Sequence, residues 1–261
     1  MRERGGRTNL NRKKNHQTRR TNPGAFLGSK LSFTATEAYK LLRTNLLYCV
    51  AEDKPCKCIG ITSAVQGEGK STTAINLAYM LAEDGKRTCI VEADLRAPNL
   101  AARLNATQGA GLSQVLAGIA NGKGLIMPTE LHSNLYVVPS GDVPPNPAEL
   151  LGTKKMAGII SLLSERFDYI IVDLPPITVV SDALVVANLL DGMLMVVREG
   201  YCTRRDFDDA VQLLSVLGNK LLGYVVTHSA QKTGRYGKRY GHYRKYGSKY
   251  GSYYHADSRR S

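Results

Sequence analysis

A glycine-rich loop at residues 64–71 limits the folds open to this chain more than any other segment. Its sequence is AVQGEGKS, and it lies between an apolar run at 58–62 that predicts a strand and residues 72–81 that predict a helix. A loop in this setting is typical of a phosphate-binding loop. Its glycines let backbone N–H groups surround an anion, and the first helical turn adds free donors. The pattern is the looser form of the motif, because Ala64 stands where the strict form has glycine.

The same loop supplies most of the residues that we predict to bind ATP and Mg²⁺. Lys70 is long enough to reach the β- and γ-phosphates, and the hydroxyl of Ser71 is a suitable Mg²⁺ ligand. The predicted nucleotide-binding residues are Gln66, Gly67, Glu68, Gly69, Lys70, Ser71 and Thr72.

Two further apolar runs end in carboxylates. Residues 87–94 end in Glu92 and Asp94, and residues 169–173 end in Asp173. Ligands bind beyond the carboxyl ends of the strands in open α/β sheets, so these carboxylates should meet the phosphate loop. An apolar strand that ends in Asp is typical of a Walker B strand, which holds Mg²⁺ directly or through water. The predicted metal ligands are Ser71, Asp94 and Asp173, and the predicted catalytic residues are Lys70, Glu92, Asp94 and Asp173.

Strands and helices alternate along the middle of the chain. Further strands are expected at 135–139, 192–198 and 221–227, and helices at 36–51, 147–167, 180–190 and 203–217. Such alternation predicts an α/β fold of the P-loop NTPase type, with a mostly parallel sheet and helices on both of its faces.

The net charge of +13 comes from the two ends of the chain. Residues 1–30 and residues 231–261 each carry nine basic residues and one acidic residue, so the segment between them is mildly acidic. We therefore expect a disordered basic extension at 1–30, a folded domain at 31–230 and a flexible tail at 231–261. Basic tails can also contact nucleic acid or an anionic membrane surface.

The C-terminal segment is rich in tyrosine but has no aliphatic partners with which to form a core. One interpretation is nucleic-acid binding by basic and aromatic residues, which the acidic core disfavours. The other is a substrate segment with exposed phenols. The predicted phosphorylation sites are Tyr236, Tyr240, Tyr243, Tyr246, Tyr250, Tyr253 and Tyr254.

Three charged residues share a face of the predicted helix at 36–51. Glu37, Lys40 and Arg43 are three positions apart. This spacing is compatible with a solvated ion pair or with an interaction surface between subunits.

No apolar run reaches the ~18–20 residues of a membrane-spanning helix. The basic N-terminus also lacks the apolar centre of a signal peptide. These features favour a cytoplasmic location, in which the five cysteines would be reduced.

The chain resembles the bacterial tyrosine kinases (BY-kinases) of capsule and exopolysaccharide synthesis, in their stand-alone cytoplasmic form. The resemblance covers about residues 30–261. It rests on the loop at 63–72, on VEADLRAP at 91–98 as the Walker A′ motif, on VDLPP at 172–176 as the Walker B motif, and on the tyrosine-rich tail. Residues 37–46, EAYKLLRTNL, resemble the helix that packs subunits of this family into a ring.

The resemblance implies a mechanism and partners. Lys70 and the loop amides would hold ATP, and Glu92 or Asp94 would accept the proton of an incoming tyrosine. The tail of one subunit would enter the site of its neighbour, and a membrane-anchored polysaccharide co-polymerase would activate the kinase and recruit it to the inner face of the membrane. Other tyrosine-containing proteins are further possible substrates.

Four positions depart from the family pattern. Gln66 stands where the family usually has Pro, Lys40 replaces an Arg, and Glu92 replaces the first Asp of the Walker A′ motif. Thr227 stands where the family often has an Asn near the adenine.

The alternative is a partitioning or division-site ATPase with the same type of deviant Walker motif. Those proteins usually carry an additional lysine early in the loop, and residues 62–64 contain none. They also lack a tyrosine-rich tail.

Overall fold

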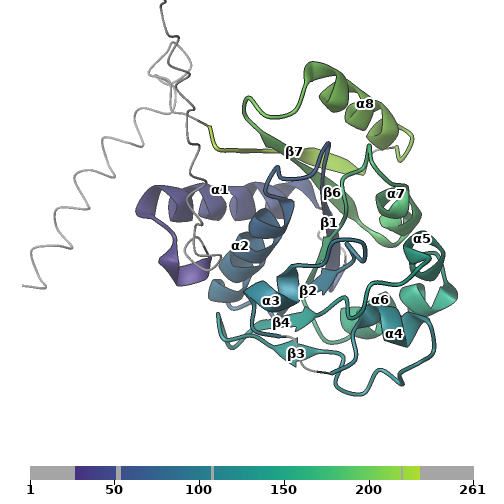
Figure 1. Cartoon of the computed structure of the whole chain (residues 1–261). Helices are drawn as coiled ribbons and strands as arrows, with labels where there is room; N and C mark the ends of the chain where they lie inside the picture. The colour runs from purple at the N-terminus through teal and green to yellow at the C-terminus, as the bar shows by residue number, and fades with distance from the viewer. Residues whose placement is uncertain (1–26, 51–53, 107–108, 219, 230–261) are drawn as a thin grey trace, which may run out of the picture.

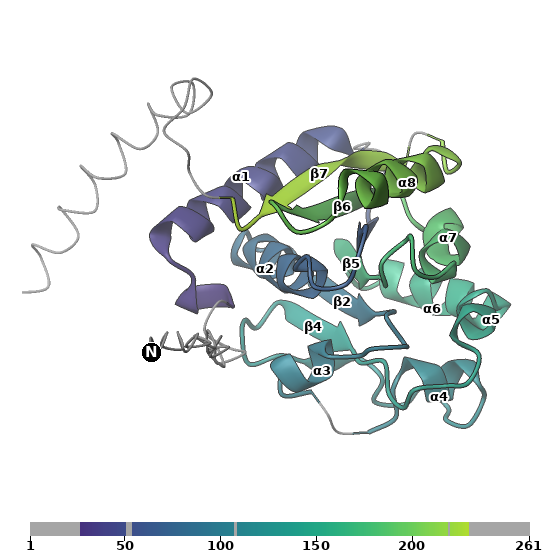
Figure 2. The same cartoon turned by 45° about the horizontal axis from the view of Figure 1, so that its top comes forward.

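The fold is built on one seven-stranded sheet (Figures 1 and 2). This computed structural model describes residues 27–50, 54–106, 109–218 and 220–229. The strand order is β3-β4-β2-β5-β1-β6-β7, and every neighbouring pair is parallel except β3 with β4. The strands are β1 (Lys57–Ser63), β2 (Thr88–Glu92), β3 (Met127–Pro128), β4 (Leu135–Val138), β5 (Tyr169–Asp173), β6 (Gly192–Arg198) and β7 (Leu221–Thr227). The predicted α/β fold with a mostly parallel sheet is confirmed.

Helices cover both faces of the sheet (Figure 2). The α-helices are α1 (Phe33–Cys49), α2 (Lys70–Glu83), α3 (Leu100–Arg103), α4 (Leu112–Leu116), α5 (Pro147–Leu151), α6 (Lys154–Ser164), α7 (Asp182–Val186) and α8 (Arg204–Ser215). Short 3₁₀ turns lie at Gly28–Lys30 and Ala187–Leu189. The helix that follows the phosphate loop, α2, is the most buried of them, with twelve of its fourteen residues in the interior.

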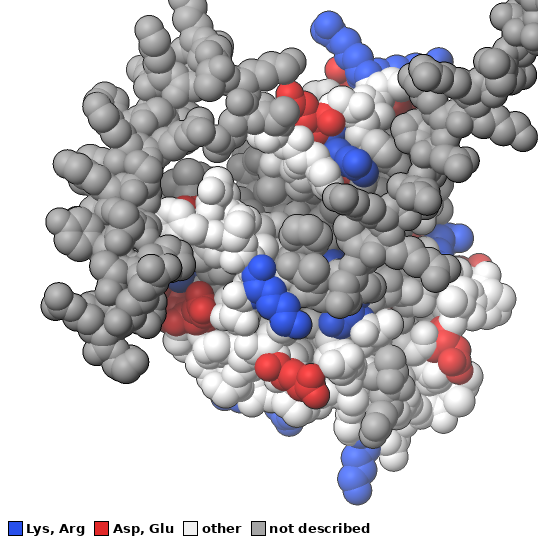
Figure 3. Space-filling model, turned by 60° about the vertical axis from the view of Figure 1, so that its left-hand side comes forward, with Lys and Arg blue, Asp and Glu red and all other residues white. Residues whose placement is uncertain are grey.

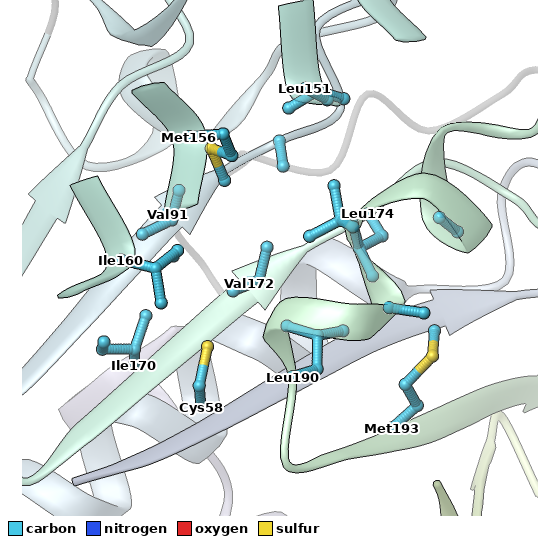
Figure 4. Close-up of a cluster of buried hydrophobic side chains, with 14 of the residues drawn as sticks. Cys58, Val91, Leu151, Met156, Ile160, Ile170, Val172, Leu174, Leu190 and Met193 are labelled. Atoms are coloured by element: carbon cyan, nitrogen blue, oxygen red, sulfur yellow. The ribbon is translucent and has the colours of Figure 1, made fainter. Parts of the chain in front are cut away.

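Alternate residues of the central strands enter two separate cores, as the two-residue period of a strand requires. On β5, Ile170 and Val172 face the core beneath α6, whereas Tyr169 and Ile171 face the core beneath α2. Figure 4 shows the first of these cores, where Met156 and Ile160 of α6 lie over the sheet. Both cores hold the strands in fixed register, and this fixes where each strand ends.

One predicted helix was wrong. The segment 147–167 forms two helices, α5 and α6, rather than one. The chain breaks at Gly152 and Thr153, where the Thr153 side chain accepts the N–H of Met156 and caps α6. The predicted helix at 180–190 is a single turn of α-helix followed by a 3₁₀ turn. The predicted helix at 36–51 is α1, which begins at Phe33 because Ser32 caps it.

The three charged residues of α1 divide into two roles. Lys40 and Glu37 form an exposed ion pair at 2.9 Å. Arg43 turns inward instead: its guanidinium donates to the carbonyl of Met80 at 2.9 Å and lies 3.1 Å from the carboxylate of Asp84. Arg43 therefore ties α1 to the C-terminal end of α2, where carbonyl groups lack helical partners.

Charges of both signs are mixed on the described surface of the face drawn in Figure 3. Residues 1–26 and 230–261, which hold nearly all of the two predicted basic tails, lie outside the described residues. The search for a membrane-spanning helix, which covered the described residues, found no helix that is long and apolar enough.

Arg43→Ala should lower the free energy of unfolding by about 1–3 kcal/mol, because it removes a part-buried charged hydrogen bond and an ion pair. Lys40→Ala on the same helix should change it little, because exposed ion pairs stabilise proteins weakly. Urea denaturation of both variants measures the difference. Equal midpoints for the two variants would contradict the inward role of Arg43.

Candidate active site

The phosphate loop joins β1 to α2 at the carboxyl edge of the sheet. Gly67 and Gly69 have φ values of 88° and 98°, in the left-handed region that favours glycine. A Cβ atom on Gly67 would also lie 2.8 Å from the hydroxyl oxygen of Tyr201. The loop backbone therefore passes close to its neighbours, and the N–H groups in the first turn of α2 lack partners within the helix. This is the arrangement that binds phosphate.

Glu68 supports this loop through its side chain. The carboxylate is fully buried and accepts the backbone N–H of Val65 at 2.9 Å and of Arg198 at 3.1 Å. It thereby fixes the loop to the end of β6. Because both carboxylate oxygens of Glu68 are already engaged, any contact of this residue with a phosphate would come from its backbone N–H group.

Thr227, at the end of β7, lies against the same loop. Its hydroxyl donates to the carbonyl of Glu68 at 2.8 Å. A Cβ atom on Gly69 would lie 3.6 Å from the Thr227 methyl carbon. The residue aligned with the adenine-site Asn of the family thus supports the loop backbone in this structure.

Lys70 and Asp94 form a buried ion pair. The ammonium of Lys70, at the start of α2, lies 2.9 Å from Asp94 Oδ2, and the two side chains are 8% and 5% exposed. Asp94 follows β2, and its other oxygen accepts the N–H of Ala97 at 3.2 Å. The structure therefore brings together two residues that the sequence placed in the site separately. A nucleotide phosphate offers Lys70 a second anion at the same place.

The carboxylate of Asp173, at the end of β5, is sealed from solvent. Neither oxygen has a hydrogen-bond partner of standard geometry among the described residues. Burial raises the pKa of this carboxyl to about 7, although the nearby charge of Lys70 and the neighbouring Ser71 hydroxyl oppose the shift. A buried carboxylate in this state is incomplete without a cation.

The donor set at this edge fits Mg²⁺. Asp173 is paired in register with Glu92 on one side and with Ile61 on the other, so it lies between the ends of β2 and β1. Mg²⁺ typically binds through one or two carboxylates, water and the phosphates of the substrate. Ser71, Asp94 and Asp173 are the predicted ligands, and all three are buried at this edge. They would hold the ion, which would supply positive charge against the phosphates.

Glu92 lies at the same edge but is differently engaged. Its Oε1 accepts the N–H groups of Asn99, at 2.6 Å, and of Leu100, and its Oε2 accepts the N–H of Ser140 at 3.0 Å. The residue is 1% exposed. The structure thus places this predicted catalytic residue against the backbone of two loops.

A small cavity of about 150 Å³ opens beside Asp94. Its polar lining comes from Gln66, Asp94 and Arg96, and its apolar lining from Ala97, Pro175, Pro176, Val179 and Val180. Arg96 forms a bidentate pair with Asp182, at 2.8 and 3.0 Å, which holds one wall of the cavity. An acceptor group in this cavity would lie next to the Lys70–Asp94 pair.

Two arginines make contacts at this site although no sequence pattern had placed them there. Arg96 holds the cavity wall, and the guanidinium of Arg103 donates to the hydroxyl of Thr72 at 2.8 Å. Arg96 lies within the Walker A′ motif, so the sequence could have indicated that it belongs to the site. No motif marks Arg103, which follows Asp94 by nine residues.

The comparisons with known proteins agree on the fold and on the relatives. A sequence model of the ParA family, described as the NUBPL iron-transfer P-loop NTPase, matches residues 55–254. The tyrosine-protein kinase CpsD of Streptococcus agalactiae serotype Ia is 37% identical over 202 residues, which cover 77% of this chain and 85% of that protein. The chain belongs to the bacterial tyrosine kinase family.

Other relatives give the same result. The tyrosine-protein kinase YwqD of Bacillus subtilis is 35% identical over 208 residues, which cover 80% of this chain and 86% of that kinase. The kinase domain of the Escherichia coli tyrosine kinase ETK superposes with a TM-score of 0.72 at 29% identity, over 87% of this chain and 88% of that domain. The resemblance to BY-kinases is therefore confirmed, and the ParA description covers the broader nucleotide-binding fold that this kinase shares.

In this kinase, Asp173→Asn should stabilise the metal-free protein in a pH-dependent way. The pKa of Asp173 is raised from 3.8 to about 7 in the folded state, so the folded state holds the proton more tightly than the unfolded chain. That contribution favours folding at low pH and is lost as the pH rises through about 7. At about pH 8 the variant should gain roughly 2–4 kcal/mol in unfolding free energy, and the gain should vanish towards pH ~4.

Chemical denaturation at both pH values, without metal, measures this effect. Asp209→Asn is the control, because that carboxylate is 56% exposed. Adding Mg²⁺ should stabilise the wild type and leave Asp173→Asn unchanged. An Asn variant that is no more stable than the wild type at the higher pH would show that Asp173 is not destabilised by burial.

Proposed function

We propose that this chain is an ATP-dependent protein-tyrosine kinase that phosphorylates its own C-terminal tyrosines in trans and regulates capsular or exopolysaccharide synthesis. The observation that carries the proposal is the buried Lys70–Asp94 pair beside Asp173, whose carboxylate has no hydrogen bond of standard geometry among the described residues. It supplies a phosphate-binding cation, a proton acceptor and a metal ligand at one edge of the sheet. The chain also provides seven tyrosines in its last 31 residues as acceptors.

Each residue has a role in the transfer. Lys70 and the loop amides bind the phosphates of ATP, and Ser71, Asp94 and Asp173 would hold Mg²⁺. The phenol oxygen of tyrosine forms the new bond to the γ-phosphorus, and the bond from that phosphorus to the β-phosphate oxygen breaks. ADP leaves, and Asp94 accepts the phenol proton. Catalysis is mainly positioning and charge stabilisation.

The acceptor tyrosine enters the cavity beside Asp94. Its apolar lining, which includes Pro175 and Pro176, suits the ring of a phenol, and its polar side presents Asp94 to the hydroxyl. A basic tail is attracted to a mildly acidic folded domain, which raises its local concentration near the site. Each phosphate adds about −1.5 to −2 charges and weakens that attraction, so the reaction should limit itself.

The proposed partners are a second copy of this chain and a membrane-anchored polysaccharide co-polymerase. The co-polymerase would recruit the kinase from the cytoplasm to the inner face of the membrane, as the resemblance implies. Autophosphorylation assayed with and without the cytoplasmic segment of a candidate co-polymerase tests this partner: an unchanged rate with every candidate speaks against it.

The alternative raised by the sequence, a partitioning or division-site ATPase that switches its dimerisation, is compatible with the match to the ParA family. In that case phosphate would be transferred to water. Phosphate release without any phosphotyrosine, from protein incubated with ATP and Mg²⁺, would favour the ATPase.

A mixing experiment tests autophosphorylation in trans. Lys70→Met removes the phosphate-binding cation but keeps the tail, and replacement of all seven tail tyrosines by Phe removes the acceptors but keeps the site. Neither variant alone should become phosphorylated with ATP and Mg²⁺. A mixture of the two should place phosphate on the tail of the Lys70→Met protein, as read by mass spectrometry.

The wild type is the positive control, with phosphate expected on Tyr236, Tyr240, Tyr243, Tyr246, Tyr250, Tyr253 and Tyr254. Phosphate on Tyr39, Tyr79 or Tyr169 with a bare tail would defeat the substrate-tail proposal. Full phosphorylation of the Lys70→Met protein on its own would defeat the site assignment.

Self-association should depend on the exposed face of α1. Glu37→Ala with Lys40→Ala should lower the assembled mass in light scattering and slow phosphorylation in trans. Arg43 is left intact, because its loss would also weaken the attachment of α1 to α2. Arg204→Ala with Asp208→Ala is the matched control, since it removes an exposed ion pair from α8. If both double variants have the same assembled mass, Glu37 and Lys40 form only a solvated surface ion pair and do not mediate self-association.

A further inference from the structure

The start of helix α3 is held by hydrogen bonds to the side chain of Glu92. The N–H groups of Asn99 and Leu100, where α3 begins, both donate to Glu92 Oε1, while Ser140 in the loop after β4 donates to Oε2. The carboxylate is almost wholly buried, and its oxygens are committed to three backbone donors. Glu92 does not line the cavity beside Asp94. Its contacts are those of a residue that holds loops in place.

The other end of α3 reaches the phosphate loop. Arg103 is the last residue of this helix, and its Nη2 donates to Thr72 Oγ1 at 2.8 Å. Thr72 is the third residue of α2, in the turn whose free N–H groups bind phosphate. The short helix therefore spans from the Glu92 carboxylate to the edge of the nucleotide site.

Arg103 brings a positive charge that lacks a carboxylate partner at contact distance. Among the ion pairs of the described residues, none includes Arg103. Burial lowers the pKa of its guanidinium, and the charge of Asp173 opposes this shift, so the group lies within electrostatic range of the proposed metal ligand. A partly buried guanidinium next to a phosphate-binding turn is suited to a phosphate oxygen.

We infer that Arg103 binds a phosphate of the nucleotide, and that Glu92 is a positioning residue that holds α3 so that Arg103 reaches it. The inference rests on the proposed function only in that a nucleotide occupies the phosphate loop. It assigns the proton transfer to Asp94 alone. It also accounts for Glu at a position where the family usually has Asp, because the longer side chain reaches the backbone of both loops.

Calorimetric titration with ADP and Mg²⁺ tests the role of Arg103 without turnover. Arg103→Met should weaken ADP binding by about tenfold or more, because it removes a charged hydrogen bond. Arg103→Lys keeps the charge but not the forked donor, so its loss should be smaller. Arg166→Met is the control for loss of one positive charge, since Arg166 is exposed and lies ahead of β5, at the opposite edge of the sheet.

Double-variant measurements test the link between the two residues. Glu92→Asp should weaken ADP binding, because the shorter side chain cannot hold both loops, and should lower kcat at saturating ATP much less. Glu92→Asp combined with Arg103→Met should bind ADP about as weakly as Arg103→Met alone, because the two residues act as one unit. Circular dichroism verifies folding, and Glu92→Gln, which keeps the size of the side chain, replaces Glu92→Asp if that variant is unfolded.

Two results would overturn the inference. If Arg103→Met and Arg103→Lys bind ADP like the wild type, Arg103 does not contact the phosphates. If the folded Glu92 variants keep full ADP affinity but lose turnover by ~100-fold or more, Glu92 is the proton acceptor instead. Neither result removes the proposed kinase, which fails separately if the wild type binds no nucleotide.

Discussion

The site depends on an excess of buried negative charge at the carboxyl edge of the sheet. Asp94 has Lys70 as its partner, whereas Asp173 has no hydrogen bond of standard geometry and no ion pair in the described part of the chain. Charges removed from water are costly unless they are paired, so this edge is under-compensated in the protein alone. A divalent cation would correct the imbalance, and Asp94 would also need it if Lys70 turned to a phosphate. Nucleotide and metal binding would then support each other.

Two other carboxylates at this edge show why acidic residues in a motif need not bind the ligand. Glu68 and Glu92 are as buried as Asp173, but each has backbone N–H groups as partners. Hydrogen bonds satisfy their charge and, in return, fix the loops that carry them. Glu68 fixes the phosphate loop to β6, and Glu92 fixes α3 and the loop after β4. The precision of the site rests on these two residues.

The sequence predicted those parts of the site that lie at the ends of apolar strands. β2 and β5 are marked by continuous hydrophobic runs, so Asp94 and Asp173 could be placed at one edge without coordinates. The distant donors to these carboxylates could not be foreseen, because Arg198 lies 130 residues from Glu68 and Ser140 lies 48 residues from Glu92 along the chain. Almost every residue type can also supply a backbone N–H group, so no sequence motif marks these donors.

Some side chains form hydrogen bonds with the nearby backbone that interrupt a helix, and this explains where the secondary structure differs from the prediction. The segment 147–167 has enough apolar residues for one helix, but Thr153 offers its side chain to the backbone and starts a new helix there. A hydrophobic pattern shows which residues are buried, but it contains no information about such a helix cap. In α1 the spacing predicted the exposed pair of Glu37 and Lys40. It could not show that Arg43 turns inward, because its partners Met80 and Asp84 lie at the end of another helix.

The lining of the cavity beside Asp94 suggests a reason why this fold would transfer phosphate to a phenol rather than to water. The cavity beside Asp94 is mostly apolar, and its lining includes prolines and valines besides Gln66, Asp94 and Arg96. The apolar part of this lining offers a water no hydrogen bonds, whereas an aromatic ring could pack against it and bring its hydroxyl to the carboxylate. The pair between Arg96 and the fully buried Asp182 keeps that wall in place. In the proposed kinase, the cavity wall would therefore favour a phenol as the acceptor, while the loop, Lys70 and Asp173 would provide the nucleotide chemistry.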